Sequence, residues 1–108
     1  MNEVEFNTKL EFKNGLSHAH KSGIKCVTIR NGVRHYSPNI TVYGYVAKVE
    51  SQRVYKLSEV PFETLQKDGF TSFSHAISTL KEFYPEIEYD SPVTVIEFRM
   101  IVPPVKLY

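Results

Sequence analysis

One segment of this chain has the spacing of an amphipathic helix, and several short segments around it have the composition of strands. In residues 71–85, TSFSHAISTLKEFYP, apolar residues recur every three or four positions, and Pro85 ends the pattern. Residues 25–30, KCVTIR, and 93–101, VTVIEFRMI, are rich in β-branched residues, which favour strands. One face of the second strand carries Ile96, Phe98 and Met100. Because helices do not alternate regularly with these strands, the sequence predicts an α+β fold with a mixed or barrel-like sheet.

The middle of the chain predicts further strands and a short helix. Residues 40–49, ITVYGYVAKV, predict one strand in which Gly44 marks a bend or bulge, and residues 53–57 predict a partner strand. Residues 58–68 predict a short helix, in which Pro61 fits only the first turn. A third short helix could run from Asn14, as its cap, to Ser22, with Gly23 ending it. With the helix at 71–85, the chain is therefore expected to carry two or three helices.

Length and composition limit the class of protein. A chain of 108 residues is expected to form one domain with one core. Cys26 is the single cysteine, so an internal disulfide cannot form. The first residues, MNEVEFNTKLEF, mix charges with apolar residues, and no apolar run approaches the ~20 residues that span a bilayer. We expect a cytoplasmic protein without a membrane segment.

The charges are unevenly distributed along the chain. The net charge is +1, but no acidic residue lies between Glu11 and Glu50, where six Lys and Arg residues and three histidines are found. Acidic residues dominate from Glu50 to Asp90. This asymmetry predicts either a local basic patch or a solvated face that the acidic half balances in space.

Lys25 and Thr28 form the first candidate pair for chemistry. A threonine hydroxyl becomes a useful nucleophile when a base removes its proton, and a lysine with a lowered pKa can be that base. Side chains three apart on a regular strand point to opposite faces, so the pair can meet only if Lys25 lies in a turn or a bulge intervenes. A surface lysine and a strand threonine are the structural alternative.

Asp68 is the second candidate. It lies in KDGF, residues 67–70, just before a glycine that is expected to end a helix. A carboxylate at a helix C-terminus opposes the helix dipole, which is a small indication of a function beyond the turn itself. An ordinary helix-terminal residue is the alternative interpretation.

Metal and thiol chemistry are poorly supported. His18 and His20 are two residues apart and would not share a helix face, and no cysteine pair or HExxH motif accompanies them. Cys26 lies in an apolar strand, where a thiol usually packs. We expect neither a metal site nor a cofactor.

Aromatic residues interleave with the basic ones. Rings beside cations are how proteins hold unpaired bases, although most rings in a small domain belong to its core. The candidate substrate-binding residues are Arg30, Arg34, Tyr36, Tyr43 and Phe70. Arg30 could hold a carbonyl or phosphate oxygen with its planar donors.

These motifs, in this order, resemble a known family. GIKCVTIRNG, with KDGF, KEFYP and VTVIEFRMI after it, is similar to the G-x-K-x-x-T-x-R signature and later motifs of the ASCH domain family, relatives of the PUA RNA-binding domains. The resemblance covers about residues 8–101 and leaves 102–108 as an extended tail. It implies a small PUA-like mixed β-barrel with two or three helices packed around it.

The resemblance also implies an activity. Some family members are small amidohydrolases that remove the acetyl group from N4-acetylcytidine, using a lysine that activates a threonine with help from a glutamate. By position, Lys25 would be the base and Thr28 the nucleophile, while Asp68, shorter by one methylene, replaces the glutamate. The alternative is a non-catalytic module, or a ribonuclease, that holds RNA or a modified nucleotide in the same cleft. The expected partner is a nucleoside or short RNA rather than DNA.

Overall fold

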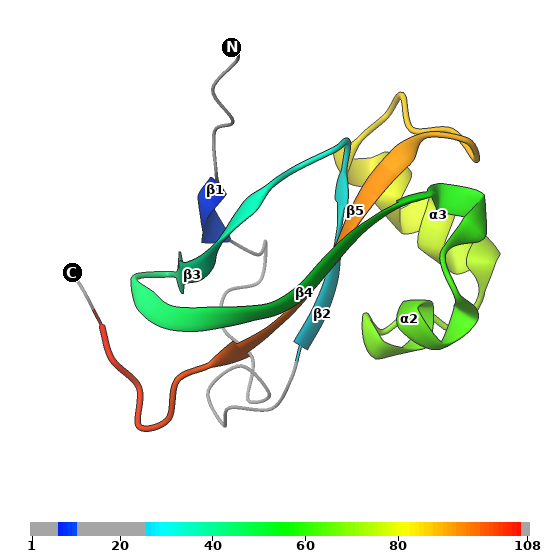
Figure 1. Ribbon diagram of the computed structural model, residues 1–108. Coiled ribbons are helices and arrows are strands. Elements are labelled where there is room, and N and C mark those ends of the chain that lie inside the picture. The colour runs from blue at the N-terminus through cyan, green and yellow to red at the C-terminus, as the bar shows by residue number, and fades with distance from the viewer. Residues whose placement is uncertain (1–6, 11–25, 107–108) are drawn as a thin grey trace, which may run out of the picture.

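A five-stranded mixed sheet forms the centre of the computed structural model, which describes residues 7–10 and 26–106 (Figure 1). The strands are β1 (Asn7–Leu10), β2 (Cys26–Asn31), β3 (Tyr36–Val42), β4 (Tyr45–Lys56) and β5 (Pro92–Met100). Their order across the sheet is β1-β3-β4-β5-β2. β1 is parallel to β3, and the other three pairs are antiparallel. The predicted α+β class with a mixed sheet is confirmed.

A tight hairpin joins β3 and β4, where the sequence predicted one continuous strand. Val42 pairs with Tyr45, so the loop contains only Tyr43 and Gly44. Both have positive φ angles, 52° and 84°, as a two-residue hairpin turn of type I′ requires. The prediction of a single strand over 40–49 is therefore wrong, because Gly44 permits a chain reversal and not merely a bend.

The sequence predicted a bend or bulge at Gly44, but the bulge lies farther along the chain, within β4. The register against β5 shifts between Val49 and Ser51. Residues 53–57, predicted as a separate partner strand, are the continuation of β4 and the first residue of the next turn. The shift changes which residues face each side of the sheet, because side chains alternate along a strand.

Two α-helices and a 3₁₀ turn in the described part of the chain lie against the sheet on the side opposite β1 and the β3–β4 turn (Figure 1). The predicted helix over 58–68 is divided into η1 (Leu57–Glu59) and α2 (Phe62–Lys67), with Pro61 as the residue that precedes α2. Proline lacks a backbone donor, so it is tolerated at a helix start but not inside. The helix predicted over 14–22 lies outside the described residues. None of the described helices is long and apolar enough to cross a membrane.

The helix predicted over 71–85 is confirmed as α3 (Phe73–Phe83). The hydroxyl of Ser72 accepts a hydrogen bond from the backbone N–H of His75 at 3.0 Å, which is an N-cap. α3 ends before Pro85, and its buried residues are Ala76, Ile77 and Leu80. Their spacing places them on one helix face, toward the sheet.

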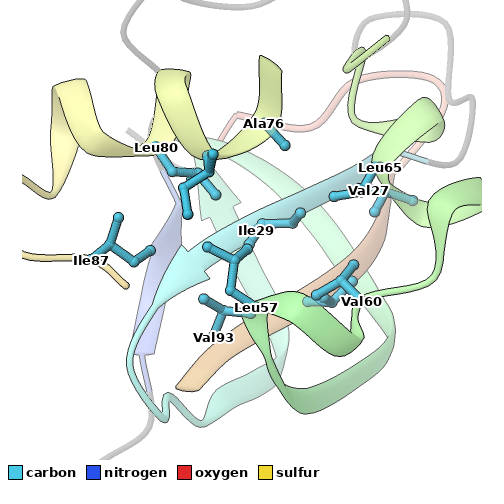
Figure 2. Packing of buried hydrophobic residues seen from close by; sticks show 11 residues of the cluster. Val27, Ile29, Leu57, Val60, Leu65, Ala76, Leu80, Ile87 and Val93 are labelled. Atoms are coloured by element: carbon cyan, nitrogen blue, oxygen red, sulfur yellow. The ribbon is translucent and has the colours of Figure 1, made fainter. Parts of the chain in front are cut away.

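Each face of the sheet has its own apolar cluster. The first lies between the sheet, α2 and α3, and Figure 2 shows Ile29 of β2 between α3 and the segment that carries Leu57 and Val60. The second lies on the opposite face and contains Ile96, Phe98 and Met100, as the alternation predicted. β5 is therefore buried on both sides, which explains its nearly continuous apolar sequence.

Thr94 fixes the chain that leaves β2. This residue is 0% exposed in the middle of β5. Its hydroxyl donates to the carbonyl of Gly32 at 2.7 Å and accepts from the backbone N–H of Arg34 at 2.9 Å. One side chain thus satisfies two backbone groups of the loop between β2 and β3.

We expect Thr94→Val to lower the free energy of unfolding by about 1–3 kcal/mol, because it leaves two backbone groups of the loop without their partner while preserving shape. Urea unfolding measures the change. Thr79→Val, at a half-buried position of α3, is the control and should cost less. Equal stability of Thr94→Val and the parent would contradict this role of the hydroxyl.

Candidate functional site

β2 positions two of the predicted site residues on one side of the sheet. Val27 and Ile29 belong to the cluster under the helices, so the alternating residues Thr28 and Arg30 lie on the other side. Thr28 is 5% exposed and pairs with Ile96 of the second cluster. Arg30 is half-buried. Lys25, the predicted base, lies outside the described residues.

The end of α2 places Asp68 beside this strand. Asp68 is the C-cap residue, and Gly69 follows with a φ angle of 96°. The Gly69 N–H donates to the carbonyl of Gln66 and the Phe70 N–H to that of Leu65, at 3.0 and 2.9 Å. This pair of bonds defines a Schellman motif, in which glycine takes the left-handed position at little cost. KDGF is therefore a helix-terminating turn, as the sequence predicted.

The carboxyl group of Asp68 contacts the backbone of β2. It accepts a hydrogen bond from the backbone N–H of Ile29, the residue between Thr28 and Arg30. β2 is the last strand on its side of the described sheet. Its outer backbone groups therefore need partners other than a strand. Asp68 provides one, and Arg34 provides another through its Nε, which donates to the Asn31 carbonyl at 2.9 Å.

The surroundings of Asp68 change its acidity. Burial raises the pKa of the Asp68 carboxyl from 3.8 to about 7, because the charged form loses hydration. The Ile29 hydrogen bond and the nearby positive charge of Arg30 lower the pKa, but they offset only part of this effect. A carboxyl group with a pKa near 7 can donate or accept a proton at neutral pH, as general acid–base catalysis requires.

The other predicted substrate-binding residues are dispersed. Tyr36 is 2% exposed within the second cluster, and its backbone N–H and C=O bond to the side-chain amide of Gln52 at 2.8 and 2.9 Å. Tyr43 lies in the hairpin turn and packs against the same cluster. Phe70 packs against the first cluster, with its ring edge-on to His75. Asp68 therefore reaches the backbone of β2 between Thr28 and Arg30, whose side chains lie on the face away from the helices. Arg34 lies at the strand's end.

Two groups that support the candidate site, the backbone N–H of Ile29 and the hydroxyl of Thr94, could not be identified from residue types. The bond to Asp68 uses the backbone N–H of Ile29, which almost every residue type has, so the sequence does not indicate it. Thr94 is visible in the sequence as a hydroxyl within the apolar run VTVI, but the sequence does not indicate which groups it bonds. Within residues 7–10 and 26–106, no group of three or more His, Cys, Asp or Glu side chains is placed to hold a metal ion.

Comparison with known proteins gives no match: no family model, no curated protein and no solved structure is significantly similar to the chain.

The raised pKa of Asp68 predicts a specific pH dependence of stability. The folded protein holds this proton up to about pH 7, whereas the unfolded chain releases it near 3.8. The associated stabilisation is therefore complete at low pH and is lost as the pH rises through 7. Between about pH 5 and pH 8 the parent should lose about 2–3 kcal/mol relative to Asp68→Asn.

The Asp68→Asn protein is the matched comparison, because its amide oxygen can still accept from Ile29 but does not titrate. Urea unfolding of both proteins across this pH range isolates the contribution of one carboxyl group. Parallel stability curves for the two proteins would show that Asp68 titrates with an ordinary pKa.

Proposed function

We propose that this protein is an ASCH-domain amidohydrolase that acts on an acylated pyrimidine nucleoside such as N4-acetylcytidine. The observation that carries the proposal is the Asp68 carboxyl group, with its pKa of about 7, on the backbone of Ile29 between Thr28 and Arg30. Asp68 is far from β2 in sequence, and its carboxyl group bonds the backbone of the residue that follows Thr28. Thr28 and Asp68 are two of the three catalytic residues that the family resemblance implies, the third being Lys25, and Arg30 belongs to the same signature.

The PUA-like barrel is part of the proposal. It is supported by apolar clusters on both faces of the sheet and by the bulge that re-aims β4. A barrel would place Thr28 on its inner side, with Ile96 and Tyr36. A nucleophile there is shielded from bulk water, which strengthens electrostatic contacts to a bound substrate.

In the proposed reaction, the Thr28 hydroxyl oxygen attacks the acyl carbonyl carbon while Lys25 removes its proton. The carbonyl oxygen becomes negatively charged, and the Arg30 guanidinium stabilises it. The C–N bond then breaks, and protonated Asp68 donates a proton to the departing exocyclic nitrogen. Water then attacks the acyl-threonine ester and gives one proton to the Asp68 carboxylate, while protonated Lys25 returns its proton to the Thr28 oxygen. A carboxylic acid is released, and Lys25, Thr28 and Asp68 return to their starting states.

The shorter side chain of aspartate fits this arrangement. The Schellman motif brings the end of α2 close enough for the Asp68 carboxyl group to accept from the β2 backbone. From this helix end the shorter side chain of aspartate already reaches the β2 backbone, which supports a role for aspartate at this site.

Turnover of N4-acetylcytidine to cytidine, followed by chromatography, tests the proposal. Thr28→Val keeps the shape of the side chain and removes the nucleophile, so we expect a loss of at least ~10³-fold in kcat. Thr28→Ser keeps the hydroxyl and should retain measurable turnover. Unfolding midpoints of both variants verify that they are folded.

The pH dependence of kcat/KM tests the part assigned to Asp68. Because the protonated carboxyl group donates to the leaving nitrogen, the rate of the parent should fall above about pH 7. Asp68→Asn should lose ~10²–10⁴-fold in rate.

Full activity of Thr28→Val would disprove the proposal. Binding of the nucleoside or of short RNA without any cytidine formed would instead favour the binding module.

A further inference from the structure

A polar groove lies on the helix side of the sheet, beside α2. Its volume is about 330 Å³, within the ~300–1,000 Å³ that is usual for small-molecule sites. Its lining comes from three elements: Ser51, Arg53 and Tyr55 of β4, Val95 and Glu97 of β5, and Thr64 of α2. None of these residues belongs to the proposed hydrolase site.

The bulge in β4 is what presents the groove's polar side chains. Before the register shift at Val49/Ser51, Ala47 and its alternating neighbours pack against the second cluster. After it, Tyr55 packs against the first cluster, on the helix side. Ser51, Arg53 and Tyr55 are two residues apart along β4, so their side chains lie on the same face of the sheet. A bulge at this point re-aims a row of side chains, as bulges beside functional sites do.

The strand register places unlike groups next to one another. Ser51 pairs with Glu97, and Arg53 pairs with Val95. Arg53 and Glu97 are thus diagonal neighbours across two strands, within reach of one ligand. Val95, which is 5% exposed, is the one aliphatic side chain among the lining residues, and it pairs with Arg53.

The chemistry of this lining selects a class of ligand. Arg53 supplies donors, the Glu97 carboxylate supplies acceptors, and the hydroxyls of Ser51, Thr64 and Tyr55 can do both. Glu97 disfavours a simple anion and Arg53 a simple cation. A polyhydroxylated ring meets both requirements, since its hydroxyls donate and accept and its C–H face can contact Val95. Two adjacent hydroxyls also match the two oxygens of one carboxylate.

We propose that this groove binds a polyhydroxylated ring, either a free sugar or the ribose of a nucleoside. The site does not depend on the proposed hydrolase activity. The two sites share no residue: five of the six lining residues come from β4 and β5, whereas the Asp68 carboxyl group bonds the outward N–H of Ile29 in β2. Thr64 of α2, one turn before Asp68, is the lining residue nearest to the proposed hydrolase site in sequence. The buried side chains of Ile29 and Leu65 belong to the core on this face.

Amide ¹H–¹⁵N spectra of the Asp68→Asn protein, titrated with cytidine, ribose, glucose and cytosine, test the groove without turnover. We expect saturable shifts at residues 51–55, Thr64 and 95–97 with cytidine or with a free sugar, and none there with cytosine. Shifts with cytidine alone identify a nucleoside as the ligand, and shifts with ribose or glucose identify a sugar. Glu97→Gln and Arg53→Ala should each weaken binding by at least ~10-fold.

Lys56→Ala is the matched control, since Lys56 is a neighbouring cation of β4 that does not line the groove, and it should leave the affinity unchanged. Absence of saturable shifts in the groove with all four compounds would overturn the inference. Shifts confined to Ile29 and its neighbours would also overturn it while leaving the hydrolase proposal intact.

Discussion

Burial of Val27 and Ile29 beneath α2 and α3 is the interaction on which the arrangement of this protein depends. These two side chains join β2 to Leu65 of α2 and to Leu80 of α3 in one cluster (Figure 2). Fully burying a side chain of this size contributes about 1.5–3 kcal/mol. Within the described sheet, β2 pairs with β5 on one side only. The packing of the helices therefore determines which side chains reach the backbone groups of its other edge.

The chemistry of the candidate site follows from this packing. When Leu65 of α2 is drawn into the core, the turn after the helix brings Asp68 against the outer edge of β2. The carboxyl group satisfies a backbone donor that would otherwise lack a partner at a strand edge. The same burial removes water from the carboxyl group and raises its pKa to about 7. A structural contact and an acid–base group are therefore one feature.

The local patterns predicted the elements that carry strong periodicity. The helical spacing and Pro85 were sufficient to predict α3, and the alternation of Ile96, Phe98 and Met100 was sufficient to predict one face of β5. The hairpin at Tyr43–Gly44 was missed, because Gly44, within a run of strand-forming residues, was interpreted as a bend or bulge in one strand. Alternation continues through a two-residue turn, so periodicity alone does not distinguish one long strand from two short ones.

The sequence by itself determined the α+β class, the helix over 71–85, the strands predicted at 25–30 and 93–101, and the turn at KDGF, because each depends on residues close together in the chain. Only the tertiary structure decided that Asp68 meets Ile29 beside Thr28 and Arg30, and that Ser51, Arg53 and Glu97 line one groove. The first contact uses a backbone donor, and the second set depends on a one-residue bulge that inverts the facing of β4. Both arise from strand register and helix docking, which no short stretch of sequence encodes.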